Sequence, residues 1–567
     1  MKIYFSFIFT FLFCQTSFGQ NLTLQIDGSN LLEKKIIDSL QYSSKHNNIK
    51  SIQDEIAKTT NKLLEIGFIA VSTVDALQKK DSIFKTTLQL GPQIKTIYIT
   101  VRKNSFLKQL PDLTKKDTVT LPYAEAIPFL NRSSQALEQR GFALVRLSLI
   151  NITTVNTSIF AELHAATDQK RTLNAIVVKY SPDGKNNPFP KGHSSQINKK
   201  YKNKIFNKGI LNEIYQDFEN FQFVTQTKYP EILFTADSTK VYVYLEKRKA
   251  NTFDGFIGFA NTENNKLALN GYVDIKLTNI LGTGEQVALY WKSDGNNQKS
   301  FNATVELPYI AQTPIGLKAQ LQLFRQDSTF QNTKTAIDLS YLINYNTRLY
   351  MGYNTTISND IQNSAITTIG DFTNRFITST FTYSKITTRD YILPTKTFFS
   401  CTAGVGARKV INEDTNSNSR QFFIAMQAAY LITLNKKNNI HLASQNYYLQ
   451  SDQYVINEQY RFGGFNSIRG FAENSLQAYF TSSILTEYRH NLAPNLYLHT
   501  ILDYCRYANQ QENQQLKKTT NIFGVGFGLG LQTKNGLLKF ALATGSTSNQ
   551  QIQFINTIAH ICYYVKF

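Results

Sequence analysis

Within residues 522–532, large apolar residues alternate with glycine without interruption from Phe523 to Leu531. Successive side chains of a β-strand point to opposite faces, so one face of this segment is wholly apolar and the other has no side chains. An apolar outer face and a small or polar inner face are typical of a transmembrane β-barrel. The outer face consists of Phe523, Val525, Phe527, Leu529 and Leu531, and the inner face of Gly524, Gly526, Gly528 and Gly530.

The same alternation continues from residue 253 to residue 567, in segments longer than the roughly 5–6 residues of an ordinary strand. A tilted transmembrane strand needs about 9–11 residues, which these segments provide. An even number of strands closes an antiparallel barrel with both ends on one side. We predict sixteen strands, at 253–262, 265–278, 284–294, 299–309, 317–327, 332–345, 346–358, 372–388, 396–411, 418–434, 438–450, 476–490, 495–508, 518–534, 535–547 and 553–567.

Residues 1–19 have the pattern of a signal peptide. Lys2 is followed by an apolar run, and Ser17-Phe18-Gly19 places small residues at the two positions that signal peptidase reads. We therefore expect cleavage before Gln20 and an exported protein. A lipoprotein reading of Cys14 is disfavoured because Phe13, which is not small, precedes it. After residue 20 no apolar run approaches the ~20 residues that a membrane helix needs.

Composition narrows the classes of partner and chemistry. The formal net charge is +20, from 60 Lys plus Arg against 40 Asp plus Glu, which favours an anionic membrane surface or nucleic acid. Nucleic acid is the weaker choice, because zinc-finger spacing, basic heptads and RNA-recognition motifs are missing. The widely spaced Cys401, Cys505 and Cys562 form neither a disulfide framework nor a zinc site. No cofactor or metal is predicted.

The part before the barrel shows one order of elements three times. Each copy begins with a short strand, continues with helical patterns and ends with two strands. The helix of the first copy ends at Gly67-Phe68 and that of the second at Gly141-Phe142, whereas the third has Asn220-Phe221. We expect three α+β domains of β-α-α-β-β order, at 20–92, 93–168 and 169–250, before a barrel at 251–567.

The segment 460–471, YRFGGFNSIRGF, lies between two predicted strands and is rich in glycine and aromatic residues. Glycines allow tight turns, and Phe465 and Phe471 supply packing, so this loop suits a cavity better than an exposed surface. It closely resembles the signature loop of the outer-membrane assembly superfamily that includes BamA and TamA. The matching residues are Arg461, Phe462, Gly463, Gly464, Ile468, Arg469, Gly470 and Phe471.

The resemblance implies that the loop, residues 451–475, folds into the barrel between strands eleven and twelve. It also implies that the three N-terminal modules are POTRA domains and that the barrel has sixteen strands, so our strand count is not independent of it. The segment 279–285 resembles the family's turn between the second and third strands. Tyr563, Val565 and Phe567 resemble the C-terminal signal of an outer-membrane barrel strand.

A buried Arg469 requires a partner, because an unpaired guanidinium is costly to bury. Glu487 and Asp503 alternate with outward-facing apolar residues, so both should face the lumen. In the resembled family, acidic residues at matching points of these strands bind the loop arginine. Family members carry Asp-x-Gly at the position that matches Asp503, and here Cys505 replaces the glycine. The glycine face at 524–530 should leave room for the loop against the wall.

No catalytic motif is present: the sequence has no Gly-x-Ser-x-Gly, His-Glu-x-x-His or Cys-x-x-Cys. We therefore expect no enzyme. The resemblance implies instead a bacterial outer-membrane factor that inserts or exports unfolded client proteins, with its POTRA domains in the periplasm. Expected partners are clients, membrane lipid and accessory proteins. The alternatives are a two-partner secretion transporter, which typically has two POTRA domains, and a passive channel. Three domains and modest length favour a TamA-like member.

Overall fold

A computed structural model describes residues 22–75, 77–103, 105–114, 116–166, 169–181, 189–261, 267–294, 298–327, 329–361, 369–386, 395–411, 416–509, 519–533, 536–547 and 557–566. The predicted signal peptide and Phe567 lie outside these residues. The chain divides into two compact units: Met1–Thr172 with Ile205–Gly209, and Leu173–Lys204 with Ile210–Phe567. Among the described helices, none has the length and apolarity needed to cross a bilayer.

The first module is a mixed sheet with two helices. Its strands are β1 (Leu22–Gly28), β2 (Lys45–His46), β3 (Ser72–Thr73), β4 (Gln78–Lys80) and β5 (Ile83–Gln89), and its helices are α1 (Leu31–Ser39) and α2 (Ile49–Glu65). The first strand pairs in parallel with the last. Asn30 and Asn48 cap the two helices by accepting hydrogen bonds from backbone N–H groups of the first turn. Ile26, Ile37, Ile52 and Leu63 are fully buried between sheet and helices.

The second module departs from the predicted β-α-α-β-β order. Short 3₁₀ turns at Phe106–Gln109 and Pro111–Leu113 take the place of a first helix. An added strand, β7 (Thr118–Pro122), pairs with β6 (Thr96–Thr100). Helix α3 (Ala126–Gln139) and strands β8 (Leu147–Val155) and β9 (Ser158–Ala165) follow as predicted. Pro111 restricts the backbone, and the short apolar run around Leu107 and Leu113 packs into the core without forming a longer helix.

The third module returns to the predicted order. It comprises β10 (Ala175–Ser181), α4 (Lys191–Tyr201), α5 (Lys208–Glu219), β11 (Val224–Gln226), β12 (Glu231–Phe234) and β13 (Thr239–Lys247), with β10 and β13 parallel. The first of its two expected closing strands is divided into β11 and β12, each of which pairs with β13. Pro230, which has no N–H to donate to a ladder, stands directly before β12.

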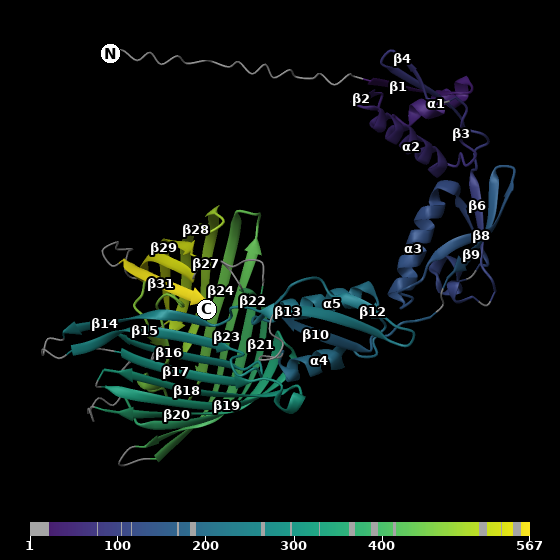
Figure 1. Ribbon diagram of the computed structural model, residues 1–567. Coiled ribbons are helices and arrows are strands. Elements are labelled where there is room, and N and C mark those ends of the chain that lie inside the picture. The colour runs from purple at the N-terminus through teal and green to yellow at the C-terminus, as the bar shows by residue number, and fades with distance from the viewer. Residues whose placement is uncertain are drawn as a thin grey trace, which may run out of the picture. The chain divides into compact units, whose positions relative to one another are not determined.

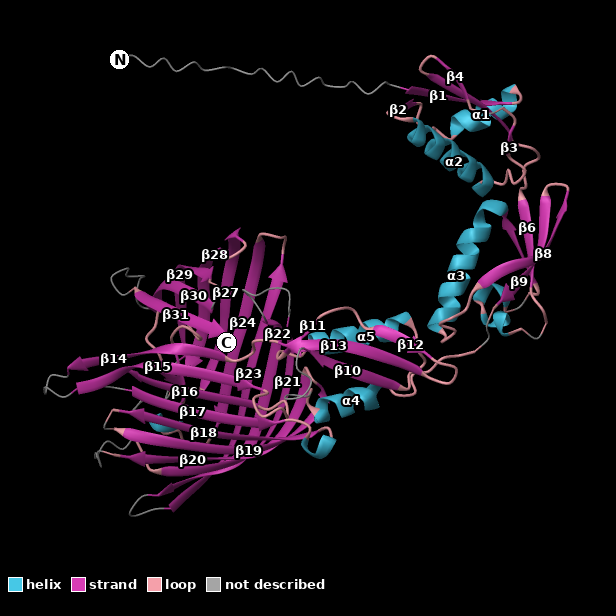
Figure 2. Ribbon diagram, in the orientation of Figure 1, coloured by secondary structure: helices cyan, strands magenta, loops and turns pink. Residues whose placement is uncertain are grey.

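The remaining strands form a closed antiparallel barrel of sixteen strands, as predicted (Figure 1). They are β14 (Thr252–Asn261), β15 (Leu267–Thr278), β16 (Gln286–Asp294), β17 (Gln298–Leu307), β18 (Ile315–Gln326), β19 (Phe330–Asn344), β20 (Thr347–Asp360), β21 (Phe372–Ile386), β22 (Thr395–Ile411), β23 (Asn416–Thr433), β24 (Asn438–Gln450), β27 (Phe480–Ala493), β28 (Leu496–Ala508), β29 (Thr519–Gln532), β30 (Gly536–Thr547) and β31 (Ile558–Lys566). Figure 2 shows that, beyond β13, the labelled elements are strands. The predicted strand at 476–490 begins later, because β26 (Leu476–Ala478) pairs instead with β25 (Tyr460–Phe462) inside the loop.

The barrel wall is apolar outside and polar inside, the reverse of a soluble protein. On β19, Ile337 and Leu339 are about three-fifths exposed, while Asp338 and Ser340 between them are buried. On β29, Phe523, Val525 and Phe527 are exposed, which confirms the outward face predicted from the alternation. This exposed apolar surface suits the hydrocarbon core of a bilayer, where every strand must satisfy its backbone through its neighbours.

An aromatic cluster joins α4 of the third module to three turns of the barrel. His193 of α4 is 1% exposed, and its ring lies 4.7 Å from that of Tyr309 and 6.0 Å from that of Tyr345. A side chain at Gly284 would clash with this ring, because its Cβ would lie 2.1 Å from Cε1 of His193. Among the described residues, neither ring nitrogen has a hydrogen-bond partner. Burial lowers the pKa of His193 from 6.5 to about 3.

The buried imidazole predicts an acid-sensitive junction. The pKa of His193 is depressed in the folded state, so folding favours the neutral ring. Above the ordinary pKa of 6.5 the ring is neutral in the unfolded state too, and its burial then takes nothing from the free energy of unfolding. Stability is lost as the pH falls from about 6.5 towards 3, and the loss at pH 5 is about 2 kcal/mol. Hydrogen exchange of α4, corrected for intrinsic rates, should show decreasing protection over this range. His193→Phe should remove the dependence, and His164→Phe, at an exposed position, should not. Equal acid sensitivity in both variants would contradict this origin.

Candidate functional site

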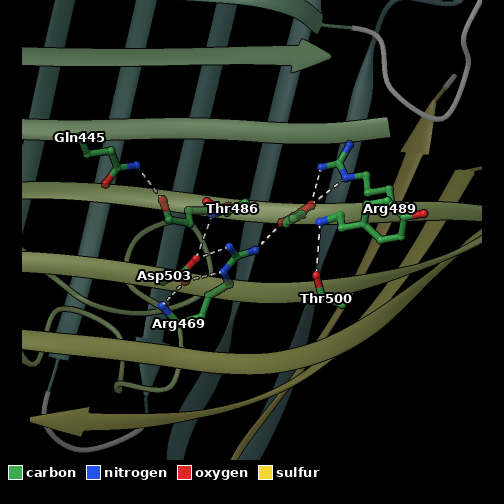
Figure 3. A network of polar contacts seen from close by, with 9 residues as sticks. Gln445, Arg469, Thr486, Arg489, Thr500 and Asp503 are labelled. Carbon is green, nitrogen blue, oxygen red and sulfur yellow. Dashed lines mark hydrogen bonds and ion pairs between the residues drawn. The ribbon is translucent and has the colours of Figure 1, made fainter. Parts of the chain in front are cut away.

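The loop between β24 and β27 folds into the barrel and fastens to its wall at the predicted arginine. Arg469 is 3% exposed, and its Nε donates to Oδ2 of Asp503 over 2.7 Å, while its backbone N–H donates to the same oxygen over 3.0 Å. Nη2 of Arg469 donates to Oδ1 of Asp503, and Nη1 donates to Oε1 of Glu487. The structure therefore brings together the three residues that the sequence analysis singled out (Figure 3).

A second arginine completes the charge balance around Glu487. Arg489 of β27 donates from Nε to Oε2 of Glu487 over 2.7 Å and forms an ion pair through Nη2 at 2.6 Å. Asp503 is 1% exposed and lies on the neighbouring strand β28. Two guanidinium groups thus face two carboxylates in one buried network (Figure 3). Ion pairs removed from water persist when they are fully paired and hydrogen-bonded, and this network meets that condition for both carboxylates. The sequence analysis did not identify Arg489, although it stands two residues after Glu487 on the same strand face.

Glycines of the wall allow the tip of the loop to approach the backbone of β29 and β30. A Cβ at Gly524 would lie 2.2 Å from the carbonyl oxygen of Arg469, and a Cβ at Gly545 would lie 2.5 Å from that of Gly470. Gly470 has φ +88°, a conformation that L side chains rarely adopt. Gly524 therefore leaves room for the loop against the wall, as predicted for the glycine face. Gly528 and Gly530 accommodate instead the lumenal rings of His499 and Tyr497.

The apolar residues of the motif pack where the loop meets the wall. Ile468 is fully buried and Phe462 is 4% exposed, and they share a cluster with Cys505 of β28 and Ile522 of β29. Cys505, which replaces the family's glycine, is itself fully buried, and its sulfur lies 3.2 Å from Oγ1 of Thr481. The side chain of Cys505 therefore fills space beneath the loop. Gly463 and Gly464, with φ +110° and +100°, turn the chain between the two halves of the motif.

The base of the loop has a second anchor that the sequence analysis missed. Glu458 pairs with Arg408 of β22, and its Oε1 accepts a hydrogen bond from Nε2 of Gln421 on β23 over 2.6 Å. Arg408 is 1% exposed, and the Glu458 side chain is 3% exposed. Asn457 donates to Oγ of Ser358 on β20 over 2.7 Å. The available signal was Arg408, a charged residue at a position whose alternation places it inside the barrel.

The predicted C-terminal residues lie beside the closure of the barrel. Val565 is paired with Phe253 of β14 and with Gly536 of β30. Tyr563 is exposed on the outer face, and its hydroxyl lies 3.0 Å from Oγ1 of Thr533. Phe567 lies outside the described residues. Among the described residues, no group of three or more His, Cys, Asp or Glu side chains could hold a metal ion.

Comparisons with known proteins agree with this architecture. Residues 279–557 match the Omp85 superfamily domain. The fold is similar to that of CdiB from Acinetobacter baumannii, with a TM-score of 0.50, 13% identity, and coverage of 91% of this chain and 98% of that one. For BamA from Haemophilus ducreyi lacking POTRA domains 1–3, the TM-score is 0.47 at 13% identity, covering 83% of this chain and 99% of that one. No curated protein sequence matches the chain.

The loop network predicts the behaviour of substitutions at residue 469. Arg469→Ala leaves Asp503 without a partner cation and frees the tip, which should cost roughly 3–5 kcal/mol. Arg469→Lys should rescue only in part, because an ammonium cannot make the bidentate contact. Protease added at the end of the barrel where the loop leaves β24 and enters β27 should cut within residues 451–479 faster in the Arg469→Ala variant. Arg506→Ala, at an exposed position of β28, is the matched control. Equal cleavage in the wild type and in Arg469→Ala would show that the network does not hold the loop.

The fold of the barrel, the loop that fills it and the matched domain lead to one assignment. Residues 279–557, most of the barrel, form an Omp85 superfamily domain.

Proposed function

We propose that this protein inserts or exports client proteins at the bacterial outer membrane by pairing client strands with its own free sheet edges. The observation that carries the proposal is the incomplete closure of the barrel. Strand β14 pairs with β15 along its whole length, from Thr252 to Asn261. Among the described residues, β14 pairs with β31 only from Thr252 to Asp254. Over the described parts of β14 and β31, the rest of this seam lacks the ladder that the other neighbouring strands form.

An incompletely paired edge is a template for another strand. Unpaired N–H and C=O groups are costly in lipid, so an incoming client strand that pairs with them gains backbone hydrogen bonds. Gly255 has φ +159°, and glycine in a strand weakens pairing. The loop supports this role, because it fills part of the lumen and leaves the seam as a route between lumen and bilayer. No covalent step is needed.

The N-terminal modules offer further edges for clients in the periplasm. In the second module the sheet order is β7-β6-β9-β8, so β8 lies at an edge. This nine-residue strand carries Ile152 and Val155, which are 58% and 55% exposed. A long edge strand with exposed apolar side chains favours addition of an extended peptide. Three such modules, with a chain of 567 residues, support a TamA-like auxiliary role.

The direct test of the function is depletion of the protein followed by quantitative proteomics of the outer membrane. An assembly factor predicts loss of many β-barrel proteins. Loss of a single secreted protein would instead identify a dedicated transporter. An unchanged outer-membrane proteome and secretome would contradict the proposal and support a channel.

The seam predicts that a covalent link between β14 and β31 blocks the function. Phe253 and Val565 are directly opposed, so Phe253→Cys with Val565→Cys meets the distance range of a disulfide. In a background without the native cysteines, oxidation should abolish client handling, and reduction should restore it. A disulfide between Ile275→Cys and Leu289→Cys, opposed on β15 and β16, is the control for a strand pair that stays closed. Full activity of the oxidised β14–β31 link would exclude lateral opening.

Removal of the first compact unit separates barrel folding from client handling. Deletion of residues 22–172 should leave a folded barrel, because the barrel strands pair with one another and not with these residues. Client assembly should fall, because the edge strand β8 is lost. Heat-dependent migration of the barrel in detergent gels reports folding, and the outer-membrane proteome reports function. A truncated protein that restores the proteome of the depleted strain would show that these modules are dispensable.

A further inference from the structure

The two arginines of the signature motif, Arg461 and Arg469, differ in their partners. Arg469 has two carboxylate partners, whereas Arg461 has none among the described residues. The guanidinium of Arg461 lies 4.9 Å from the ring centre of Phe324 and 5.1 Å from that of Phe330. Its Nη1 donates to Oε1 of Gln326 over 3.2 Å, and its Nε is buried without a hydrogen-bond partner. The proposed client handling makes no use of this cation.

Arg461 lines a lumenal cavity of about 650 Å³ between the loop and the wall. Lys334 of β19 lines the same cavity, and among the described residues no carboxylate oxygen lies within 4 Å of its Nζ. The wall here is also rich in amides, because Asn302, Asn354 and Asn374 come from β17, β20 and β21. Amides can donate hydrogen bonds to the oxygens of a bound group. The volume lies within the range of small-ligand sites.

The carboxylates around the cavity are already engaged by other cations. Glu458 pairs with Arg408, and Glu473 lies 3.4 Å from Lys292. Asp274 lies 3.5 Å from Lys276. Asp338 acts on Lys334 at longer range but also faces Lys318. Arg461 and Lys334 are therefore the two cations of the described cavity lining that have no carboxylate within 4 Å.

We propose that this cavity binds a phosphate-class oxyanion between Arg461 and Lys334. A planar guanidinium offers parallel donors that match such an anion, and the rings of Phe324 and Phe330 lie beside it. Lysine supplies a second charge, and the amides supply neutral donors. Binding compensates a partly buried cation that the protein itself leaves without a counter-charge. The group comes from a soluble phosphate compound or from the headgroup of a lipid.

Calorimetric titration of inorganic phosphate tests the site directly. The full-length protein is purified in a detergent that contains no phosphate, with phospholipid removed. The wild type should bind phosphate, and Arg461→Gln and Lys334→Gln should each weaken binding at least about ten-fold, since each removes a charged donor. Arg325→Gln removes the same charge from the exposed neighbour of Phe324 on β18 and should bind as the wild type does. Heat-dependent gel migration shows that each variant is folded.

A second arm distinguishes the two sources of phosphate. The protein is placed in nanodiscs of a phospholipid or of a phosphate-free glycolipid, and the titration is repeated. Weaker apparent binding in the phospholipid discs identifies a competing headgroup, and equal binding identifies a soluble ligand. Lys334→Gln stands on the wall and not in the loop, so it tests the site even where Arg461→Gln fails to fold. A wild type that binds no phosphate in detergent or in either disc overturns the proposal, as does undiminished binding by Lys334→Gln.

Discussion

An arginine that is buried inside a barrel is costly unless it is paired, and the position of the loop tip follows from the pairing of Arg469 with carboxylates. Asp503 and Glu487 come from adjacent strands, so the arginine bridges β27 and β28 from within. Arg489 shares Glu487 and brings the network to balance. Removing one partner from such a network is far more costly than forming it is favourable. The network therefore defines one position of the loop tip rather than simply adding stability.

The two anchors give the loop a mechanical role across the lumen. Asn457 and Glu458 bind β20, β22 and β23, whereas Arg469 and Gly470 meet β27 to β30. Because the strands at the two anchors are different, the loop connects two parts of the wall that the sheet joins through β24 on one side and through β31 and β14 to β19 on the other. A barrel whose β14–β31 seam is weakly paired can change its cross-section. A loop that is anchored to two parts of the wall limits which strands can move in such a change.

Sequence reasoning predicted the features that arise from local periodicity. Strand positions followed from the alternation, and the lumenal placement of Asp503 followed from its alternation with outward-facing apolar residues. Long-range and context-dependent features did not follow. The Arg408–Glu458 pair joins residues fifty positions apart, and no local pattern specifies that contact. The second module lost its expected first helix because tertiary packing and Pro111 override weak propensity. The glycine face was identified, but its division between loop and lumenal rings depends on neighbouring strands.

The loop also contacts strands near the seam. The ring of Phe465 lies 5.5 Å from that of His560 on β31, and Glu473 pairs with Lys292 on β16. Strand β31 is one side of the seam, and β16 is two strands beyond the other side. Any outward movement of β31 must therefore break the Phe465 contact or carry the loop with it. Arg469 holds the loop only four residues further along the chain, so the buried ion network opposes a movement of the loop together with β31. The energetic cost of opening the seam thus includes contacts of the loop, not only the short ladder between β14 and β31.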